Sequence, residues 1–222
     1  MDFERARYNM VEQQIRPWDV LDFRLLDVLQ ELPREEFVSE DQKSYAYADM
    51  NLPLPNRSVM LEPKIIARMI QALNLTPLDR VLEIGTGSGY ASAIMAKMSD
   101  HVDTIDIDGK QAEKAHETLK KLGIENVSCK VHDGFDASTY NPEDKYQAIY
   151  VGAAVSIIPN ELCEMLSENG RMVVIVGTSP VQQAMLITRN SDGDFNHKVL
   201  FDTNVPTLIE GALSIKKDFF VF

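Results

Sequence analysis

Three closely spaced glycines in the middle of the chain have the residue types and spacing of a ligand-binding turn. Gly85, Gly87 and Gly89 follow the apolar run VLEI and precede a helical pattern. Glycines at alternate positions let the backbone turn tightly and approach a ligand, because no Cβ atom stands in the way. The run is not the G-x-G-x-x-G fingerprint, and it lacks the Gly-Lys-Ser/Thr ending of a phosphate-binding P-loop. It therefore predicts a binding loop whose ligand has to be inferred from the neighbouring acids.

The acids near this loop favour one ligand over others. Asp106 ends a predicted strand about 20 residues after Gly85, where a carboxylate can accept hydrogen bonds from ribose hydroxyls. Glu83 lies inside the strand before the glycines, which suits a ligand carrying an ammonium and a sulfonium better than a pyrophosphate. Asp133 can accept a hydrogen bond from an adenine amino group, and Gly134 leaves room for the ring.

Each acid alone has a plainer interpretation. Asp133 could be a helix cap, and Asp106 a solvated strand end. Because the acids fall on three successive predicted strands, the combination favours S-adenosylmethionine as the ligand. An NAD-dependent reductase remains as a remote alternative.

The elements that must position these residues alternate between strands and helices. This alternation predicts an α/β, Rossmann-like, mainly parallel sheet with helices on both faces. A hairpin around SDGDF predicts an antiparallel edge. The predicted strands are 80–84, 102–107, 127–131, 147–152 and 171–177, with helices from about 90 and 110 and at 159–166, and the hairpin joins 184–190 to 197–202.

The N-terminal part has a different pattern. Residues 3–44 are helical in periodicity, with a helix capped by Asp19 or Asp22 and ended by Pro33. Prolines at 53, 55 and 63 exclude a continuing helix and predict an extended crossing segment. We therefore predict one domain over 1–222, composed of an N-terminal helical addition (1–50), a crossing segment (51–63) and an α/β core (64–222).

Composition excludes several function classes. The chain has 22 basic and 34 acidic residues and a formal charge of −12, which repels nucleic acid. Cys129 and Cys163 have no metal-ligand spacing, so we expect reduced thiols and no metal. A charged N-terminus and the lack of a long apolar run predict a soluble, cytoplasmic protein with no membrane partner. The C-terminal DFFVF is expected to be a final strand, with an exposed tail for association as the alternative, and the oligomeric state stays open.

A series of motifs, in order from Met10 to Gly177, resembles the protein-L-isoaspartate O-methyltransferase family. These motifs are MVEQQIR, LPREEFV, AYAD, EPKIIARM, DRVLEIGTGSGYASA, HDGF, YQAIYVGAA and GRMVVIVG. The resemblance implies a seven-stranded methyltransferase sheet with a helical N-terminal addition. It also implies that S-adenosylmethionine donates a methyl group to the free carboxylate of an isoaspartyl residue, which begins protein repair and leaves S-adenosylhomocysteine.

The same resemblance implies which residues bind the cofactor. Asp106 matches the family's ribose-binding acid, and Asp133 with Gly134 matches its adenine-side pair. The family's cofactor loop corresponds to Glu83, Gly85, Thr86, Gly87, Ser88 and Gly89.

One stretch departs from the family pattern. The family usually carries Thr-Ile-Ser, then Gln or Ala, then Pro, whereas this chain has Val59, Met60, Leu61, Glu62 and Pro63. A carboxylate is already ionised at neutral pH, so its methylation needs placement and desolvation rather than a general base. A serine hydroxyl could orient the carboxylate and Leu61 cannot, a loss of roughly 1–3 kcal/mol. Glu62 adds a repelling charge.

Several interpretations of this stretch stay open. Lys64 could supply a cation for the acceptor, or Glu62 could be a general base for a different, small-molecule acceptor. Both could instead be a solvated helix start. Val59, Met60 and Leu61 could form an apolar wall of a substrate pocket, pack under the crossing segment, or do both. A catalytically quiet cofactor-binding protein is a further alternative, and whether the N-terminal helices form a lid is undecided.

Overall fold

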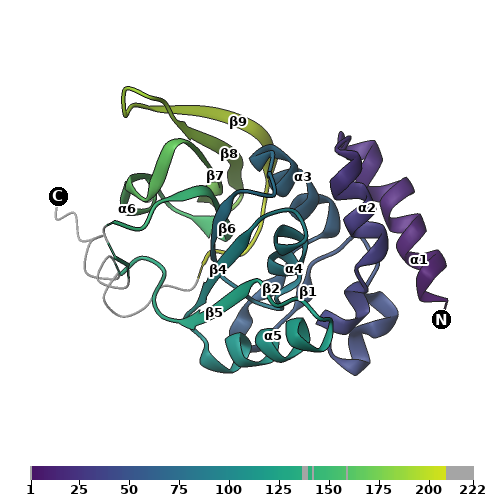
Figure 1. The fold of residues 1–222 in the computed structure, drawn as a ribbon. Helices are drawn as coiled ribbons and strands as arrows, with labels where there is room; N and C mark the ends of the chain where they lie inside the picture. Colours follow the sequence, from purple (N-terminus) through teal and green to yellow (C-terminus); the bar gives the residue numbers. More distant parts are fainter. Residues whose placement is uncertain (1, 137–139, 142, 159, 209–222) are drawn as a thin grey trace.

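A seven-stranded mixed β-sheet forms the centre of the molecule (Figure 1). The computed structural model describes residues 2–136, 140–141, 143–158 and 160–208. The strands lie in the order β5-β4-β3-β6-β7-β8-β9, parallel from β5 to β7, and β8 is antiparallel to both of its neighbours. The predicted α/β class and the closing hairpin are confirmed. The bounds are β3 (Arg80–Ile84), β4 (His101–Asp106), β5 (Val127–Val131), β6 (Tyr146–Val155), β7 (Leu166–Thr178), β8 (Val181–Arg189) and β9 (Phe195–Thr203).

The chain changes direction across the sheet at β3. From β3 it runs outward through β4 to β5, and then returns to place β6 on the other side of β3. In open α/β sheets, ligands bind at such a switch point, outside the carboxyl ends of the strands. The glycine run follows β3, Asp106 ends β4, and Asp133 comes shortly after β5. The topology therefore brings together residues that are far apart in the sequence.

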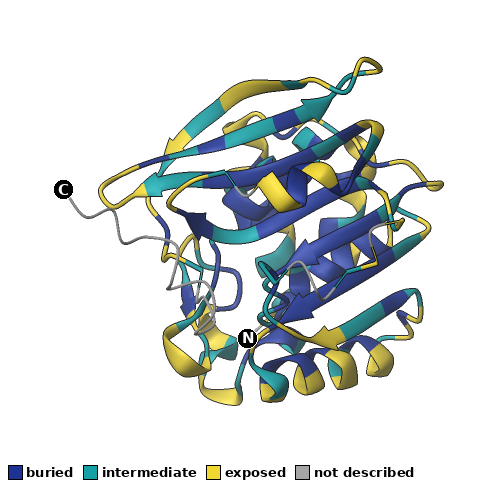
Figure 2. Cartoon of the chain, turned by 90° about the vertical axis from the view of Figure 1, so that its left-hand side faces the viewer, coloured by how far each residue is buried: buried dark blue, intermediate teal, exposed yellow. Residues whose placement is uncertain are grey.

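Helices cover the two faces of the sheet unequally, and the central strands are mostly buried (Figure 2). On the face covered by three helices, which we call the first face, Ile94 and Leu119 share a hydrophobic cluster with Val81. Within the described residues the opposite face carries only the short α6, joined by loop side chains such as Phe135 and Tyr140. The first face carries α3 (Pro63–Leu73), α4 (Tyr90–Ala96) and α5 (Gly109–Lys121), and the second carries α6 (Asn160–Glu164).

The N-terminal residues fold as short helical segments against the same core. Asp22 caps α2 because its Oδ1 accepts a hydrogen bond from the Arg24 amide at 2.9 Å, whereas Asp19 adopts a left-handed turn with φ of 63°. Leu29 of α2 belongs to the same hydrophobic cluster as Val81 of β3. Among the described helices, none combines the length and hydropathy of a bilayer-spanning segment. The segments are α1 (Phe3–Asn9), η1 (Met10–Ile15), η2 (Arg16–Trp18), α2 (Phe23–Glu31), η3 (Arg34–Phe37) and η4 (Glu40–Tyr45).

Residues 52–60, which we call the strap, form a small hairpin. β1 (Leu52–Pro53) pairs antiparallel with β2 (Val59–Met60) through the turn η5 (Pro55–Arg57). The predicted crossing segment is thus free of α-helix, but it folds back on itself rather than simply extending. At its tip, the Asn56 side-chain amide donates a hydrogen bond to Asp108, the residue that caps α5. The strap therefore connects the N-terminal addition to α5.

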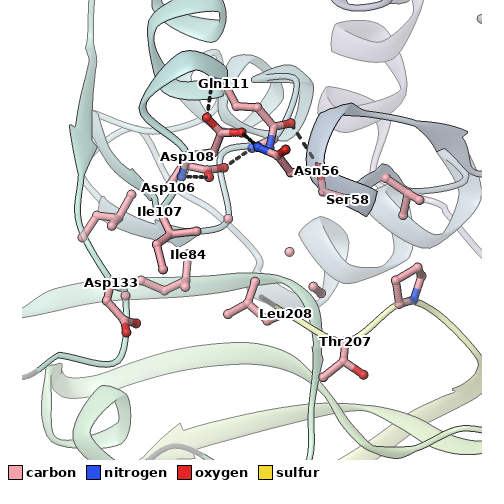
Figure 3. Close-up of a pocket in the computed structure, with 18 of the residues that line it drawn as sticks. Asn56, Ser58, Ile84, Asp106, Ile107, Asp108, Gln111, Asp133, Thr207 and Leu208 are labelled. Carbon is pink, nitrogen blue, oxygen red and sulfur yellow. Dashed lines mark hydrogen bonds between the residues drawn. The ribbon is translucent and has the colours of Figure 1, made fainter. Parts of the chain in front are cut away.

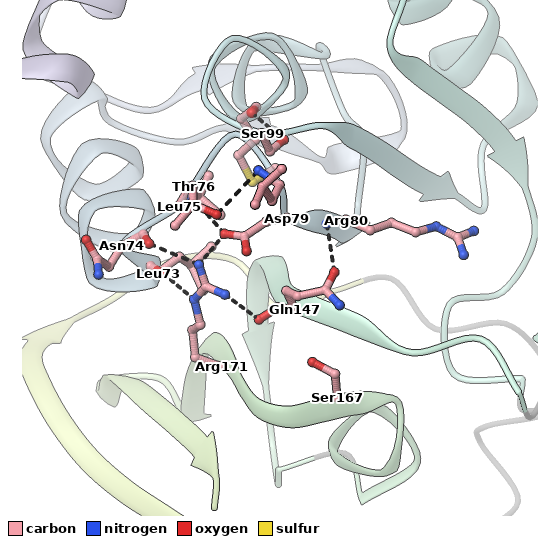
Figure 4. A network of polar contacts seen from close by, with 12 residues as sticks. Leu73, Asn74, Leu75, Thr76, Asp79, Arg80, Ser99, Gln147, Ser167 and Arg171 are labelled. Atoms are coloured by element: carbon pink, nitrogen blue, oxygen red, sulfur yellow. Dashed lines mark hydrogen bonds and ion pairs between the residues drawn. The ribbon is translucent and has the colours of Figure 1, made fainter.

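A polar network at the amino end of the sheet fixes α3 to the strands (Figure 4). The Arg171 guanidinium on β7 donates to the carbonyls of Leu73 and of Asn74, the latter at 3.0 Å, and pairs with Asp79. It also donates to the Gln147 carbonyl on β6 at 2.8 Å. Carbonyls at a helix C-terminus lack intrahelical donors, and an arginine satisfies them well. These bonds tie α3 to β6 and β7 at this end of the sheet, and the predicted binding residues lie at the other end.

Candidate active site

A cavity of about 500 Å³ opens at the carboxyl ends of the central strands (Figure 3). Its volume falls in the range of small-molecule sites, roughly 300–1,000 Å³. A space of about 30 Å³ adjoins it, and the two share Leu61 and Gly85 in their walls. Of the predicted site residues, the larger cavity is lined by Val59, Leu61, Gly85, Gly87, Asp106, Asp133 and Gly134, and the smaller space also by Met60, Glu83, Thr86 and Ser88.

The glycine loop takes backbone conformations that favour glycine. Gly85, Gly87 and Gly89 have φ of 87°, 52° and 82°, all in the left-handed region. Gly89 lines neither space. It begins α4, and a Cβ there would stand 3.0 Å from the Cβ of Ala115. The first two glycines therefore face the cavity, while the third serves close packing between α4 and α5.

Asp106 is fixed by the backbone around it. One carboxylate oxygen accepts the Gly87 amide at 2.8 Å, and the other accepts the Asp108 amide at 2.9 Å. The carboxyl is nearly buried, and burial raises its pKa above the ordinary value. Because a carboxylate oxygen can accept two hydrogen bonds, each oxygen keeps capacity for a ligand hydroxyl. This geometry could hold a ribose, and the ribose-binding role of Asp106 stays a prediction.

The other end of the same wall combines an acid with an apolar slot. Asp133 accepts the Phe135 amide at 3.0 Å and lines the cavity beside Gly134. Ile84 and Ile105 line it from the ends of β3 and β4. A Cβ on Gly134 would lie 2.5 Å from Cγ2 of Ile84, so glycine is required here for close approach. An acceptor beside a flat apolar slot fits a purine ring.

Glu83 is fully buried on β3. Its Oε2 accepts a hydrogen bond from Ser92, whereas Oε1 has no partner among the described residues. Burial raises its pKa to about 7. A buried acceptor without a donor is costly unless a ligand supplies one. Because Glu83 lines the smaller space beside the glycine loop, it fits the ammonium group of S-adenosylmethionine.

The end of the strap and the residue that follows it, Leu61, form another wall of the cavity. Val59 and Leu61 line the larger cavity, whereas the buried Met60 lines only the smaller space. The carbonyl of Leu61 accepts a hydrogen bond from the Arg34 guanidinium at 2.9 Å, and Arg34 also donates to the Ala46 carbonyl at 2.8 Å. The stretch thus packs against the core and also lines the cavity, while its role in substrate binding stays a prediction.

Arg34 is an unusual residue to find behind a cavity wall. It is fully buried and stacks at 4.6 Å on the ring of Tyr90, and no carboxylate pairs with it among the described residues. Burial lowers its pKa, because desolvation disfavours the charged form. The guanidinium is instead stabilised by carbonyl oxygens and an aromatic face. Its fixed donors hold the backbone of Leu61 in place.

Glu62 and Lys64 lie apart from this wall. The Lys64 ammonium is 2.6 Å from Asp49 and 3.1 Å from Glu62, and it stacks at 4.6 Å on Trp18. Neither Glu62 nor Lys64 lines the cavity or the smaller space. Their charges compensate each other at the start of α3. Roles for them in acceptor binding stay predictions.

The lining residues that the sequence analysis did not single out include two groups from distant segments. Asn56 and Ser58 come from the strap, and Ser58 Oγ lies 3.2 Å from Oε1 of Gln111 on α5. Pro206, Thr207 and Leu208 come from the segment after β9. Neither group has a motif or a periodicity that could have marked it. The only local signal was the short strap turn with its two prolines and Asn56.

The sequence of the chain matches one known family of methyltransferases. The family model described as Protein-L-isoaspartate(D-aspartate) O-methyltransferase (PCMT) matches residues 5–211 of the chain. The chain belongs to this family. Its relatives named protein-L-isoaspartate O-methyltransferase include one from Roseiflexus castenholzii, 39% identical and covering 86% of this chain and 87% of the relative. Others come from Geobacter metallireducens (38%, covering 87% and 88%) and Aliivibrio fischeri (35%, covering 94% and 99%).

Two solved structures share the fold of this PCMT-family chain. One is a Plasmodium falciparum protein assigned to the protein-L-isoaspartate O-methyltransferases, in complex with S-adenosyl-L-homocysteine. Its TM-score is 0.80 at 21% identity, covering 95% of this chain and 100% of that one. The other is a protein-L-isoaspartate O-methyltransferase with a TM-score of 0.76 at 28% identity, covering 92% and 65%. The predicted methyltransferase fold, the S-adenosylmethionine-dependent class and the cofactor are thereby confirmed.

We expect the affinity of this PCMT-family chain for S-adenosylmethionine to rise with pH because of Glu83. The Glu83 pKa is about 7 in the free protein, above its ordinary 4.5, so the protonated folded state is favoured. The stabilisation of the folded protein by protonated Glu83 is complete below about pH 4.5 and is lost as the pH rises through about 7. A cationic ammonium favours the ionised form, so affinity should increase between about pH 6 and 8, by at most about tenfold per pH unit. Calorimetric titrations across that range measure this increase.

Glu83→Gln should remove the pH dependence and leave weak, flat binding. Glu62→Gln is the matched control, since that carboxylate lies outside both spaces and should leave the slope unchanged. An equal slope in wild type and Glu83→Gln would contradict the assignment of the ammonium to Glu83.

Proposed function

We propose that this chain transfers the methyl group of S-adenosylmethionine to the free carboxylate of an isoaspartyl residue in a peptide or protein. The family match over residues 5–211 carries the proposal. It is supported by a cavity whose polar groups suit the cofactor: Asp106 for the ribose, Asp133 for the adenine and Glu83 for the ammonium. Gly85 and Gly87 allow the backbone to approach, and Gly134 leaves space for the ring.

The residues of the chain act by placement and by excluding water. The bound cofactor supplies a methyl group activated by a sulfonium. Val59 and Leu61 present aliphatic surface to the end of the cavity where the acceptor enters, which desolvates a carboxylate and makes its oxygen more nucleophilic. No general base is required, because the acceptor is ionised at neutral pH. The reaction therefore depends on holding one carboxylate oxygen in line with the methyl group.

A direct assay tests the proposal. We expect a peptide with one isoaspartyl residue to gain a base-labile methyl ester from labelled S-adenosylmethionine. The same peptide with an ordinary aspartyl residue should gain none. Intact cofactor binding without ester on the isoaspartyl peptide would contradict the proposal and leave the catalytically quiet alternative to be tested by release of S-adenosylhomocysteine in lysate.

Leu61 favours a second candidate, a small-molecule acceptor. Its aliphatic side chain lines the cavity at the position where the family resemblance places a serine. An acceptor that needs no donor at that position would suit it better than a carboxylate. This candidate predicts that low-molecular-weight lysate fractions, and not the isoaspartyl peptide, release S-adenosylhomocysteine.

The organisation and location of the chain are also proposals. We infer a single domain, supported by one hydrophobic cluster that contains Met10 and Leu29 of the N-terminal addition together with Val81 and Val173 of the sheet. A cytoplasmic location is supported by two cysteines that are both free thiols.

A further inference from the structure

At the proposed acceptor end of the cavity, the wall formed by Val59 and Leu61 offers no side-chain donor. Val59 and Leu61 are aliphatic, and the carbonyl of Leu61 is occupied by Arg34 at 2.9 Å. A desolvated carboxylate placed against this wall would have one oxygen without a hydrogen bond, which is unfavourable. A donor must therefore come from another part of the lining.

Two side-chain hydroxyls line the larger cavity among the described residues, Ser58 and Thr207. Ser58 is already engaged, since its Oγ donates to the Pro55 carbonyl at 2.9 Å and lies 3.2 Å from Oε1 of Gln111. The Thr207 hydroxyl makes no hydrogen bond to any residue in the described part of the chain, and the residue is exposed. Of the two hydroxyls that line the larger cavity, that of Thr207 is therefore the one available to a ligand.

The backbone around Thr207 is held firmly. The Ala154 amide donates to the Pro206 carbonyl at 3.1 Å, and the Leu208 amide donates to the Ala154 carbonyl at 2.7 Å. These two bonds form a parallel bridge between Thr207 and Ala154, which lies near the carboxyl end of β6. Just before them, the Val205 amide donates to the buried Gln182 side chain at 2.7 Å. The hydroxyl is therefore presented from a fixed segment.

The segment also lies at the correct end of the cavity. Leu208 packs on the glycine loop, since a Cβ on Gly85 would stand 3.2 Å from its Cδ1. In Figure 3, Thr207 and Asp133 lie at opposite sides of the view. The nucleoside end is marked by Asp106 and Asp133, so Thr207 faces the end left for the acceptor.

We propose that Thr207 orients the acceptor carboxylate. Its hydroxyl donates a hydrogen bond to one carboxylate oxygen, while the other oxygen forms the bond to the methyl carbon. The methyl–sulfur bond breaks, its electron pair stays on sulfur, and Thr207 keeps its proton, so no base takes part. Thr207 thus supplies from the end of β6 the donor that Leu61 does not supply from the strap. This inference rests on the proposed isoaspartyl activity.

The test compares Thr207→Val, which keeps the shape of the side chain, with Thr207→Ser, which keeps the hydroxyl. With the isoaspartyl peptide, Thr207→Val should lower kcat/KM by about 10- to 100-fold, with S-adenosylmethionine affinity and Tm unchanged. Thr207→Ser should stay within about threefold of wild type. Thr203→Val on β9, outside the cavity, is the matched control and should leave activity unchanged.

A rescue separates orientation from a structural effect. Leu61→Ser in the Thr207→Val background should restore most of the lost activity, because it returns a hydroxyl to the facing wall. If Thr207→Val turned over the isoaspartyl peptide as fast as wild type does, this inference would be overturned while the proposed function would stand. Absence of ester in the wild type, with cofactor bound, would overturn the proposed function and the inference with it.

Discussion

Replacing Asp106 by alanine is expected to weaken S-adenosylmethionine binding by about 100-fold or more. A carboxylate that hydrogen-bonds two ribose hydroxyls contributes roughly 1.5–3 kcal/mol for each bond, because the acceptor is charged. The substitution also removes the acceptor for the Gly87 amide at 2.8 Å, so the glycine loop loses a hydrogen bond that fixes its backbone. Calorimetry on purified protein measures the dissociation constant.

Asp100→Ala is the matched control for this experiment. Asp100 stands at the amino end of β4, whereas Asp106 ends the same strand at the cavity. The control should bind the cofactor as wild type does. If Asp106→Ala bound within about threefold of wild type, the assignment of the ribose to this acid would be wrong.

Gly134→Ala is expected to impair both stability and cofactor binding. The added Cβ would stand 2.5 Å from Cγ2 of Ile84, a distance at which one of the two must move. Overpacking of this kind costs about 1–3 kcal/mol. Because Ile84 lines the cavity next to Asp133, its displacement should narrow the slot for the adenine and lower affinity by at least about tenfold. Denaturant unfolding and calorimetry measure the two effects.

Gly123→Ala separates the effect on stability from the effect on cofactor binding. Gly123 has φ of 70° and no atom within 4 Å of its Cβ position, so alanine there meets only backbone strain of about 1–2 kcal/mol. It should destabilise the protein and bind the cofactor normally. Ile84→Ala should partly rescue Gly134→Ala, because it removes the clashing methyl group. Additive effects of these two substitutions would argue against the clash.

The residues proposed to bind the cofactor could be singled out from the sequence because their determinants are local. Gly85 and Gly87 follow their strand directly, and Asp106 ends its own strand. Parallel strands bring such positions to one edge whatever the loops between them do. Glu83 was also found, although only the structure shows that Ser92 satisfies one of its oxygens and leaves the other without a partner.

The proposed acceptor half could not be predicted because it is assembled from distant parts of the chain. Thr207 reaches the cavity only because the segment after β9 pairs with the end of β6. Lys64 looked available for an acceptor until its contacts with Asp49 and Glu62 were known. The unequal covering of the two sheet faces by helices could not be predicted either, because it depends on tertiary packing. The predicted C-terminal strand or tail at DFFVF lies outside the described residues.

The contact between Arg34 and the carbonyl of Leu61 has a consequence for how this scaffold changes its substrate. The guanidinium donates a hydrogen bond to the main-chain carbonyl of Leu61, so the position of this part of the cavity wall does not depend on the side chain at position 61. A new residue at position 61 would alter the chemistry offered to the acceptor while the cofactor half stays in register. If Leu61 faces the acceptor as proposed, position 61 is the place to randomise when engineering a new acceptor preference.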